Sequence, residues 1–200
     1  ILRCLVGSEM CIRDRGVPAS LLMALCQTNL RHYVTKNRTP SEVLKRLNLE
    51  LEKRIRDDMF ITLFLAVIDT QANSITYARA GHEPSLLGKQ TKDGEFVVSK
   101  LHGGGMALGM VPPHLFEEMI EDCESSFERN DMLVLYTDGV TEAANSEKEE
   151  FGTHRLSELL ASSPKSSAKD FNRMLVKQLD EFSAADSERD DVTLLTVKRV

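Results

Sequence analysis

The chain has 200 residues, of which 42% are hydrophobic and 28% are charged, and it carries a formal net charge of −6. This composition predicts one ordinary globular domain, and the negative charge argues against a nucleic-acid partner, which would need a basic surface. The longest apolar run, residues 60–68, is far shorter than the roughly 20 residues of a membrane-spanning helix.

Residues 1–15 differ from the rest of the chain because they show neither helical nor strand periodicity. Their run V-G-S-E-M-C-I-R-D-R resembles a translated sequencing-library adapter, so we expect a non-native or disordered segment and a missing true N-terminus. A disordered native extension is the alternative. The four cysteines, two of them here, lack the spacing of a zinc site or a disulfide framework, which favours a reducing cytoplasm.

Residues 16–200 are expected to form one domain that begins with two amphipathic helices. The first is predicted over residues 17–34, and apolar spacing places these residues on its buried face: Val17, Leu21, Ala24, Leu25 and Thr28. The second starts with a capping box at residues 39–42 and continues to about residue 56. Its buried face repeats every fourth residue: Val43, Leu47, Leu51 and Ile55.

The hydrophobic period then changes to that of strands. Residues 60–68 are a continuous apolar run, typical of a buried strand, and residues 74–80 are expected to pair with it in antiparallel fashion. Further strands are predicted at residues 85–87, 95–99, 114–123, 132–137 and 192–198, and helices at 153–161 and 167–182. Runs of strands with helices grouped before and after them predict an α+β fold with antiparallel sheets.

Two of these strands adjoin carboxylates. Asp138 directly follows the strand at residues 132–137, and Asp190 and Asp191 directly precede the strand at residues 192–198. Each feature has a simpler reading, since Asp138-Gly139 favours a hairpin turn and an Asp-Asp pair is often a solvated strand start. However, residues 140–144 do not resume an alternating strand, and the two strand ends could direct their carboxylates to one point.

Carboxylates without neighbouring His or Cys select oxygen-preferring ions such as Mg²⁺ or Mn²⁺. A pair of these ions about 3.5–4 Å apart can hold a bridging water as nucleophile and neutralise phosphoryl oxygens, which suits the hydrolysis of phosphate esters. Such a pair needs a carboxylate shared by both ions, so we expect a third acidic residue.

Four stretches carry a resemblance to a known family: G-V-P-A-S-L-L-M-A at residues 16–24, I-T-Y-A-R-A-G-H-E-P-S-L-L at 75–87, D-M-L-V-L-Y-T-D-G-V-T-E-A at 131–143 and R-D-D-V-T-L-L at 189–195. In order and spacing they resemble the metal-dependent protein phosphatases of type 2C (the PPM class), in the bacterial subgroup of stage II sporulation protein E and the sigma-factor-regulating phosphatases. The resemblance covers nearly everything after residue 15.

The resemblance implies two packed antiparallel sheets flanked by helices, an α-β-β-α sandwich, here missing its N-terminal strands and therefore open at one sheet edge. It implies that Asp138 and Asp190 are metal ligands, with Asp191 the weaker candidate beside them, and that Mn²⁺ or Mg²⁺ is the cofactor. The bridging aspartate of the family would fall on Cys11, and Asp14 is three residues too late to replace it.

The resemblance also implies the function. We expect the parent protein to hydrolyse phosphoserine or phosphothreonine on a regulatory protein, an anti-sigma-factor antagonist, with a metal-bound water as nucleophile and an upstream sensor domain as regulator. The chain itself is expected to be inactive because Cys11 replaces the bridging aspartate. The alternative is a catalytically silent phosphatase-like module that binds a signalling partner, and a homodimer through the N-terminal helices stays open.

Two further features have structural readings that we prefer. Residues 103–105 are three glycines, but no Lys-Ser/Thr follows them as in a phosphate-binding loop, so a flexible loop fits better. His82 is a conceivable general acid. A histidine that hydrogen-bonds at a strand end is the interpretation we favour, because polar side chains at such places usually satisfy backbone or neighbouring groups.

Overall fold

The computed structural model describes residues 2–9, 17–35, 38–54, 59–91, 93–183 and 190–200, and residues 2–9 and 17–19 by their backbone alone. They form two compact units, and each has its own sheet. The first unit comprises residues 1–82 and 102–126, and the second comprises residues 83–101 and 127–200. No helix among the described residues is both long and apolar enough to cross a membrane.

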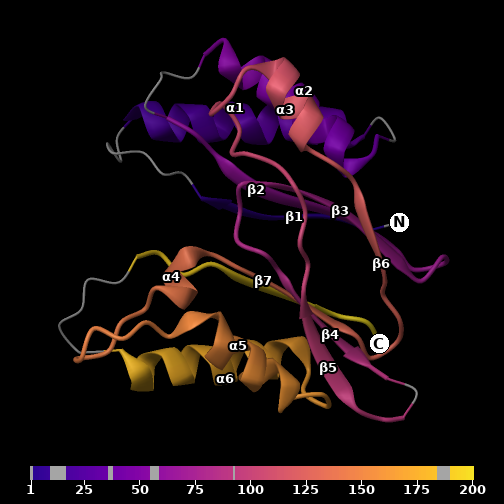
Figure 1. Ribbon diagram of the computed structural model, residues 1–200, viewed down its shortest axis with the longest axis vertical. Coiled ribbons are helices and arrows are strands. Elements are labelled where there is room, and N and C mark those ends of the chain that lie inside the picture. The colour runs from indigo at the N-terminus through magenta and orange to yellow at the C-terminus, as the bar shows by residue number, and fades with distance from the viewer. Residues whose placement is uncertain (1, 10–16, 36–37, 55–58, 92, 184–189) are drawn as a thin grey trace. The chain divides into compact units, whose positions relative to one another are not determined.

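The first unit is built on an antiparallel sheet with the strand order β1-β2-β3-β6. Its strands are β1 (Leu2–Glu9), β2 (Thr62–Asp69), β3 (Ser74–Ala80) and β6 (Cys123–Ser126). Its helices are α1 (Val17–Val34), α2 (Pro40–Glu52) and α3 (Pro113–Met119). Helix α2 packs on β2 and β3, and both α1 and α3 pack against α2 (Figure 1).

Strand β1 corrects one expectation. We predicted no strand in residues 1–15 and an open edge beside β2, but β1 pairs with β2 over its whole length, with an irregularity between Val6 and Ser8. A sheet edge offers backbone N–H and C=O groups, so a segment can pair with it without an alternating side-chain pattern. The native or non-native origin of residues 1–15 remains a prediction, and Cys11 and Asp14 lie outside the described residues.

Helix α1 matches the predicted position and α2 starts as predicted but ends at Glu52, before the expected residue 56, and the predicted buried face of α1 was wrong. The buried residues of α1 are Leu22, Cys26 and Leu30, whereas Leu21 is 67% exposed. Two apolar stripes run along this helix, and the buried one, which the prediction did not consider, contains Cys26, which packs as a small hydrophobic residue. In α2 the predicted capping box is present, and Val43, Leu47 and Leu51 are buried as expected. Ile55 lies outside the described residues.

The second unit contains an antiparallel sheet with the order β5-β4-β7-β8. Its strands are β4 (Leu86–Gln90), β5 (Phe96–Lys100), β7 (Met132–Tyr136) and β8 (Leu194–Lys198). Its helices are α4 (Asp138–Thr141), α5 (Gly152–Ala161) and α6 (Ala168–Phe182). Helix α5 packs on β4 and β5, and α6 packs on β8 (Figure 1). Two antiparallel sheets flanked by helices confirm the predicted α+β class.

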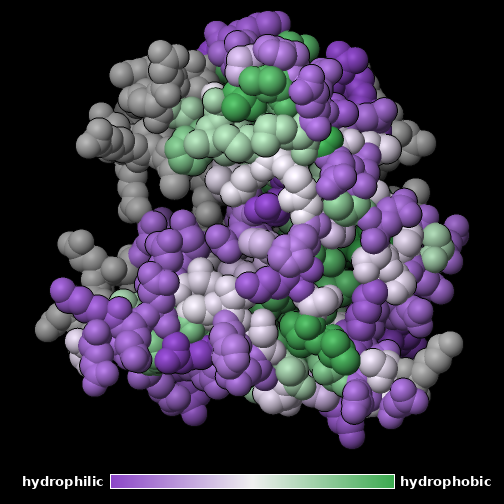
Figure 2. Space-filling model, viewed as in Figure 1, coloured by the Kyte–Doolittle hydropathy of each residue, from purple (hydrophilic) through white to green (hydrophobic). Residues whose placement is uncertain are grey.

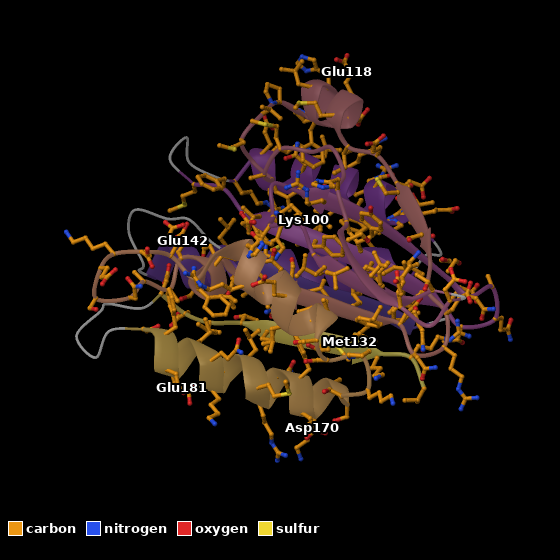
Figure 3. The ribbon with its side chains drawn as sticks, turned by 60° about the horizontal axis from the view of Figure 1, so that its bottom comes forward. Lys100, Glu118, Met132, Glu142, Asp170 and Glu181 are labelled. Atoms are coloured by element: carbon orange, nitrogen blue, oxygen red, sulfur yellow. The ribbon has the colours of Figure 1, made fainter. Side chains whose placement is uncertain are left out.

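The surface of the second unit follows the amphipathic pattern of its helices. Asp170 and Glu181 project from the side of α6 that faces away from the sheet (Figure 3), and Phe171, Leu175 and Leu179 of the same helix are buried. Figure 2 shows mainly hydrophilic residues over α5 and α6 and hydrophobic residues gathered over β5, the strand in which Val97 is 49% exposed.

Residues 114–123 were predicted as a strand, which is wrong for most of that segment. Helix α3 occupies Pro113–Met119, and only Cys123 belongs to β6. Pro113 stands in the first turn of α3, where its missing N–H is not needed, and Phe116 is the buried residue of this short helix. The alternation of apolar and polar residues was too short to separate one helical turn from a strand.

The three glycines at residues 103–105 form a loop that is closely held. The Gly103 carbonyl accepts hydrogen bonds from Nε and Nη2 of Arg79 at 3.1 and 3.0 Å. The Gly105 carbonyl accepts the Gly81 N–H at 3.2 Å, and a Cβ at Gly105 would lie 2.2 Å from the Arg79 oxygen. Glycine is therefore needed for close packing, and the expectation of a flexible loop misjudged how tightly this segment is packed.

Candidate metal centre

The candidate centre lies in the second unit, at the edge of the sheet where β7 ends and β8 begins. The two strands are antiparallel neighbours, and Tyr136, the last residue of β7, pairs with Leu194, the first of β8. Every residue of β7 is buried. The antiparallel register therefore brings the residues just after β7 and just before β8 to the same edge, as the sequence predicted for Asp138 and Asp190.

Thr137 fastens this edge with both its backbone and its side chain. Its N–H donates to the Thr193 carbonyl at 3.1 Å, and its Oγ1 accepts the Thr193 N–H at 2.8 Å. The same hydroxyl donates to the Asp191 carbonyl at 3.2 Å. Thr137 is 4% exposed, so these bonds are shielded from water and fix the course of the chain that leads into β8.

Asp138 opens the short helix α4, which sequence reasoning missed. The Asp138 carbonyl accepts the Glu142 N–H at 2.8 Å and the Thr141 hydroxyl at 3.2 Å. The Asp-Gly pair therefore starts a helical turn, and the alternative of a hairpin turn is wrong. Asp138 is half-buried at the N-terminal end of this turn, where backbone N–H groups favour a negative charge.

Gly139 allows the two chain segments to meet. A Cβ built on Gly139 would lie 2.6 Å from the Asp191 carbonyl oxygen and 3.1 Å from that of Asp190. No side chain fits at such distances, so glycine is required by the close approach of two backbones. The contact shows that the Asp190–Asp191 backbone lies directly against the start of α4.

Asp190 and Asp191 have different surroundings. The Asp191 N–H donates to Oδ1 of Asp190 at 2.9 Å, which orients the Asp190 carboxylate. Asp191 contributes its backbone carbonyl to Thr137, and both aspartates are exposed. The ranking of Asp190 above Asp191 as a metal ligand stays a prediction from the sequence.

Glu142 is a further acidic residue at this edge, and we did not single it out from the sequence. It follows α4 directly and is labelled in Figure 3. Burial raises the pKa of the Glu142 carboxyl above its ordinary value, and the negative charges of Asp138, Glu150, Asp190 and Glu83 raise it further. The sequence does contain a signal that could have identified Glu142, since it lies four residues, about one helical turn, after Asp138 in the run T-D-G-V-T-E.

The gathered charges suit a cation, but the described residues do not complete a site. No three side chains of His, Cys, Asp or Glu within the described ranges come together closely enough to hold a metal ion. Asp138 and Asp190 supply carboxylate oxygens. Together with burial, their negative charges raise the pKa of the neighbouring Glu142 carboxyl, so the local potential is negative. Oxygen donors in a negative potential suit a hard divalent cation. A third, bridging carboxylate was expected from the sequence, and the position to which it was assigned lies outside the described residues.

His82 belongs to the first unit and has the surroundings of a structural residue. It is 1% exposed, and its Nδ1 lies 3.3 Å from Oγ1 of Thr62. Its backbone carbonyl accepts a hydrogen bond of 2.6 Å from Arg79 Nη1. These contacts agree with the preferred interpretation of His82 as a buried, hydrogen-bonded histidine.

Solved structures define the class of this fold, which is that of PP2C-type phosphatase domains. The SiaA-PP2C domain of Pseudomonas aeruginosa superposes with a TM-score of 0.78 at 20% identity, covering 98% of this chain and 79% of that one. The PP2C phosphatase domain of SpoIIE from Bacillus subtilis, solved with a fragment of its regulatory domain, gives a TM-score of 0.76 at 16% identity, with 98% and 57% covered.

Sequence comparison gives the family. Residues 12–200 match the model of the family described as Stage II sporulation protein E (SpoIIE), and the chain belongs to that family. It is 32% identical over 188 residues to the phosphoserine phosphatase RsbU of Bacillus subtilis strain 168, covering 92% of this chain and 52% of RsbU. The resemblance drawn from the four motifs is thereby confirmed. The chain spans about half or less of the length of the curated relatives that it matches.

Proposed function

We propose that the protein is a metal-dependent phosphatase that removes phosphate from phosphoserine or phosphothreonine of a regulatory protein. The observation that carries the proposal is the meeting of Asp138 and Asp190 at one strand end in a chain of the SpoIIE family. RsbU, a relative over most of this chain, is named a phosphoserine phosphatase, which supports the same chemistry.

The chain's own residues would hold the ions and keep their positions. Asp138 and Asp190 provide carboxylate oxygens, Thr137 fixes the backbone between them, and Gly139 permits the close approach. Two Mn²⁺ or Mg²⁺ ions would supply a nucleophilic water and neutralise charge on the phosphoryl oxygens. RsbX, which shares the fold at a TM-score of 0.61, was solved in complex with magnesium.

Residue 11 limits the activity that we expect of this chain. The family resemblance places the bridging carboxylate at Cys11, and a cysteine there does not bridge two hard ions in the way that an aspartate does. We therefore propose that the parent protein is active and that the 200-residue chain binds metal weakly and turns over slowly.

The test compares the chain with its Cys11→Asp variant in hydrolysis of p-nitrophenyl phosphate with Mn²⁺. We expect little turnover by the chain and a clear gain in the variant, together with tighter Mn²⁺ binding by calorimetry. The variant that also carries Asp138→Asn serves as the inactive control. Hydrolysis by the unchanged chain at the rate of a full-length relative, abolished by Asp138→Asn, would contradict the role given to residue 11.

The cysteine at position 11 is also the observation that favours a second candidate function. If Cys11 is genuinely encoded, the protein is a silent phosphatase-like module that binds a signalling partner. Resequencing the gene upstream of residue 16 distinguishes the two, because an active parent requires Gly-Asp-x-Ser-Gly there. A silent module should also bind its phosphorylated partner with equal affinity in EDTA and in Mn²⁺.

The partner that we propose is an anti-sigma-factor antagonist, and the site of action is the cytoplasm. The support comes from relatives, since one solved neighbour combines the RsbU and RsbW domains of Rv1364c from Mycobacterium tuberculosis. An upstream sensor domain and a homodimer belong to the same proposal. Dephosphorylation of a purified antagonist protein, followed by phosphate-affinity gel electrophoresis, tests the substrate class directly.

A further inference from the structure

A second charged region lies in the first unit, on the outer side of α2 and beside α3. It surrounds a cavity of about 290 Å³. We call this the α2–α3 cavity, and its lining residues are Arg38, Glu42, Lys45, Arg46, Leu49 and Glu117. The volume is near the lower end of the range of small-ligand pockets, which is about 300–1,000 Å³.

The cavity is basic in a protein that is acidic. Three of its lining residues are cationic and two are anionic, whereas the whole chain has a net charge of −6. Positions 38, 42, 45, 46 and 49 recur at three- and four-residue spacing, so they share one side of α2 and of the turn before it. The opposite side carries the buried residues Val43, Leu47 and Leu51. Packing in the core therefore does not account for the cationic side.

Arg38 is held in place by groups that do not neutralise it. A small apolar cleft formed with Val34, Val43 and Leu65 also includes Arg38, and its guanidinium carbon lies 5.3 Å from the centre of the Tyr33 ring. Its Nη1 is buried and has no hydrogen-bond partner among the residues that the structure describes. A buried charged donor without a partner is costly, so an anionic acceptor that reached this atom would be stabilised by it.

The two carboxylates of the cavity do not supply that partner. Glu42 uses one carboxylate oxygen to accept the Thr39 N–H at 3.0 Å in the capping box of α2. Within the described residues, no ion pair within 4.0 Å joins Glu117 to Arg38, Lys45 or Arg46. The first N–H groups of α2 are also engaged, since the Ser41 N–H donates to Asp122 and the Glu42 N–H to Thr39. Any ligand would thus be recognised by side chains.

From these observations we propose that the α2–α3 cavity is a binding site for a phosphate-type oxyanion. Arg38 and Arg46 supply planar guanidinium groups that match the oxygens of a phosphate, and Lys45 adds a further positive charge to the cavity lining. The cavity has room for more than a single phosphate group, so the ligand is free phosphate or the phosphate of a small ester. This site does not include the metal-centre residues, and the proposal does not depend on phosphatase activity.

The test measures phosphate binding to the full 200-residue chain by isothermal titration calorimetry, in EDTA and at constant ionic strength set with chloride. EDTA removes metal-dependent binding at the candidate metal centre, and Asp138→Asn should bind phosphate as the unchanged chain does. We expect Arg46→Gln to weaken phosphate binding about tenfold or more, as for the loss of a charge-assisted hydrogen bond. Arg173→Gln, an exposed arginine of α6, is the matched control and should change nothing.

A variant that is expected to tighten phosphate binding separates an effect on binding from simple loss of structure. Glu117→Gln removes one negative charge from the cavity wall and should tighten phosphate binding about two- to fivefold. Arg38→Lys should keep the charge but weaken binding, because an ammonium group cannot replace the planar fork. Circular dichroism of each variant checks that it is folded.

A second arm replaces phosphate with O-phosphoserine and identifies the source of the anion. Equal affinities assign the site to phosphate itself, and tighter binding of O-phosphoserine assigns it to an ester. The proposal is overturned if neither ligand binds in EDTA, or if Glu117→Gln and Arg46→Gln change the affinity in the same direction.

Discussion

The two ends of strand β7 each carry an aspartate, and the two residues have opposite surroundings. Asp131, just before the strand, is 2% exposed and accepts the N–H groups of Glu128 and Gln90 at 2.7 and 3.2 Å. Its carbonyl accepts the Arg199 N–H at 3.0 Å. Asp138, just after the strand, is half-buried and lies near other carboxylates that raise the pKa of Glu142.

The comparison separates a structural carboxylate, Asp131, from a proposed metal ligand, Asp138. Burial raises the pKa of Asp131, and the backbone N–H groups of Glu128 and Gln90 oppose that rise. Backbone donors thus compensate the charge of Asp131 within the fold. The charge at Asp138 adds to that of its acidic neighbours and is best compensated by a cation. Variants at the two ends should therefore affect different properties, stability at one end and catalysis at the other.

The largest expected effect is on catalysis at the Asp138 end. In the Cys11→Asp background, Asp138→Asn should lower kcat/KM for p-nitrophenyl phosphate at least about a thousandfold, because metal ions contribute several kcal/mol to stabilising the transition state. The free energy of unfolding in EDTA should change little. If Asp138→Asn retained a tenth of the activity, Asp138 would not be a metal ligand.

At the other end of β7, Asp131→Ala should lower stability. Two buried N–H groups lose their acceptor, at about 1–3 kcal/mol each, so urea unfolding should show a loss of about 2–5 kcal/mol. Asp131→Asn, which keeps one acceptor oxygen, should lose less. Activity of the folded fraction in the Cys11→Asp background should stay within about threefold. If the Asp131→Ala protein were folded but inactive, the assignment of stability to the Asp131 end of β7 and of catalysis to the Asp138 end would be wrong.

Gly139→Ala tests the close approach of the two chain segments at the Asp138 end of β7. A Cβ 2.6 Å from the Asp191 carbonyl must push the two segments apart, at a cost of about 1–3 kcal/mol in unfolding free energy. We also expect weaker Mn²⁺ binding by calorimetry, because the shift separates Asp138 from Asp190. Ser146→Ala, at an exposed position after α4, is the control and should be neutral.

The smallest effect concerns Glu142, whose pKa is raised in the folded chain. A carboxyl with a raised folded pKa contributes stability that is present below its unfolded pKa and is lost as pH rises through the folded pKa. In EDTA, the advantage of Glu142→Gln should therefore appear as pH increases from 4 to 7. It should reach only a few tenths of a kcal/mol, because Glu142 is exposed and solvent screens its charge.

Thermal unfolding across this pH range, with and without about 0.5 M salt to screen surface charges, measures the effect of Glu142. The advantage of the Gln variant should shrink in salt and disappear when Mn²⁺ is bound. An unchanged difference at high salt would show that burial alone, without the neighbouring carboxylates, raises the pKa.

Regular periodicity made most of the fold predictable from the sequence. Residues 17–34 and 74–80 were predicted with the boundaries that the structure shows, because α1 and β3 carry clear helical and strand signals. The position of Asp138 and Asp190 at one edge also followed from the sequence, since antiparallel strands place such residues together. Their role as metal ligands is a prediction from the family resemblance.

The features that were not predictable depend on contacts between distant residues. The face of α1 that is buried is decided by its packing against α2, and the pairing of β1 with β2 needs only backbone groups. Helix α4 is too short to show a period. The cationic cavity involves Glu117 of α3, a segment predicted as a strand, so its residues could not be grouped from sequence.

The antiparallel pairing of β7 with β8 has a consequence for the order of events during synthesis. Asp138 leaves the ribosome well before Asp190, and the whole of α5 and α6 lies between them in the chain. A nascent chain that has completed β7 has only one of the two aspartates, so it has no means to hold an ion with both. An ion held by both carboxylates, as proposed above, would therefore bind only after β8 has paired with β7, when this sheet is complete.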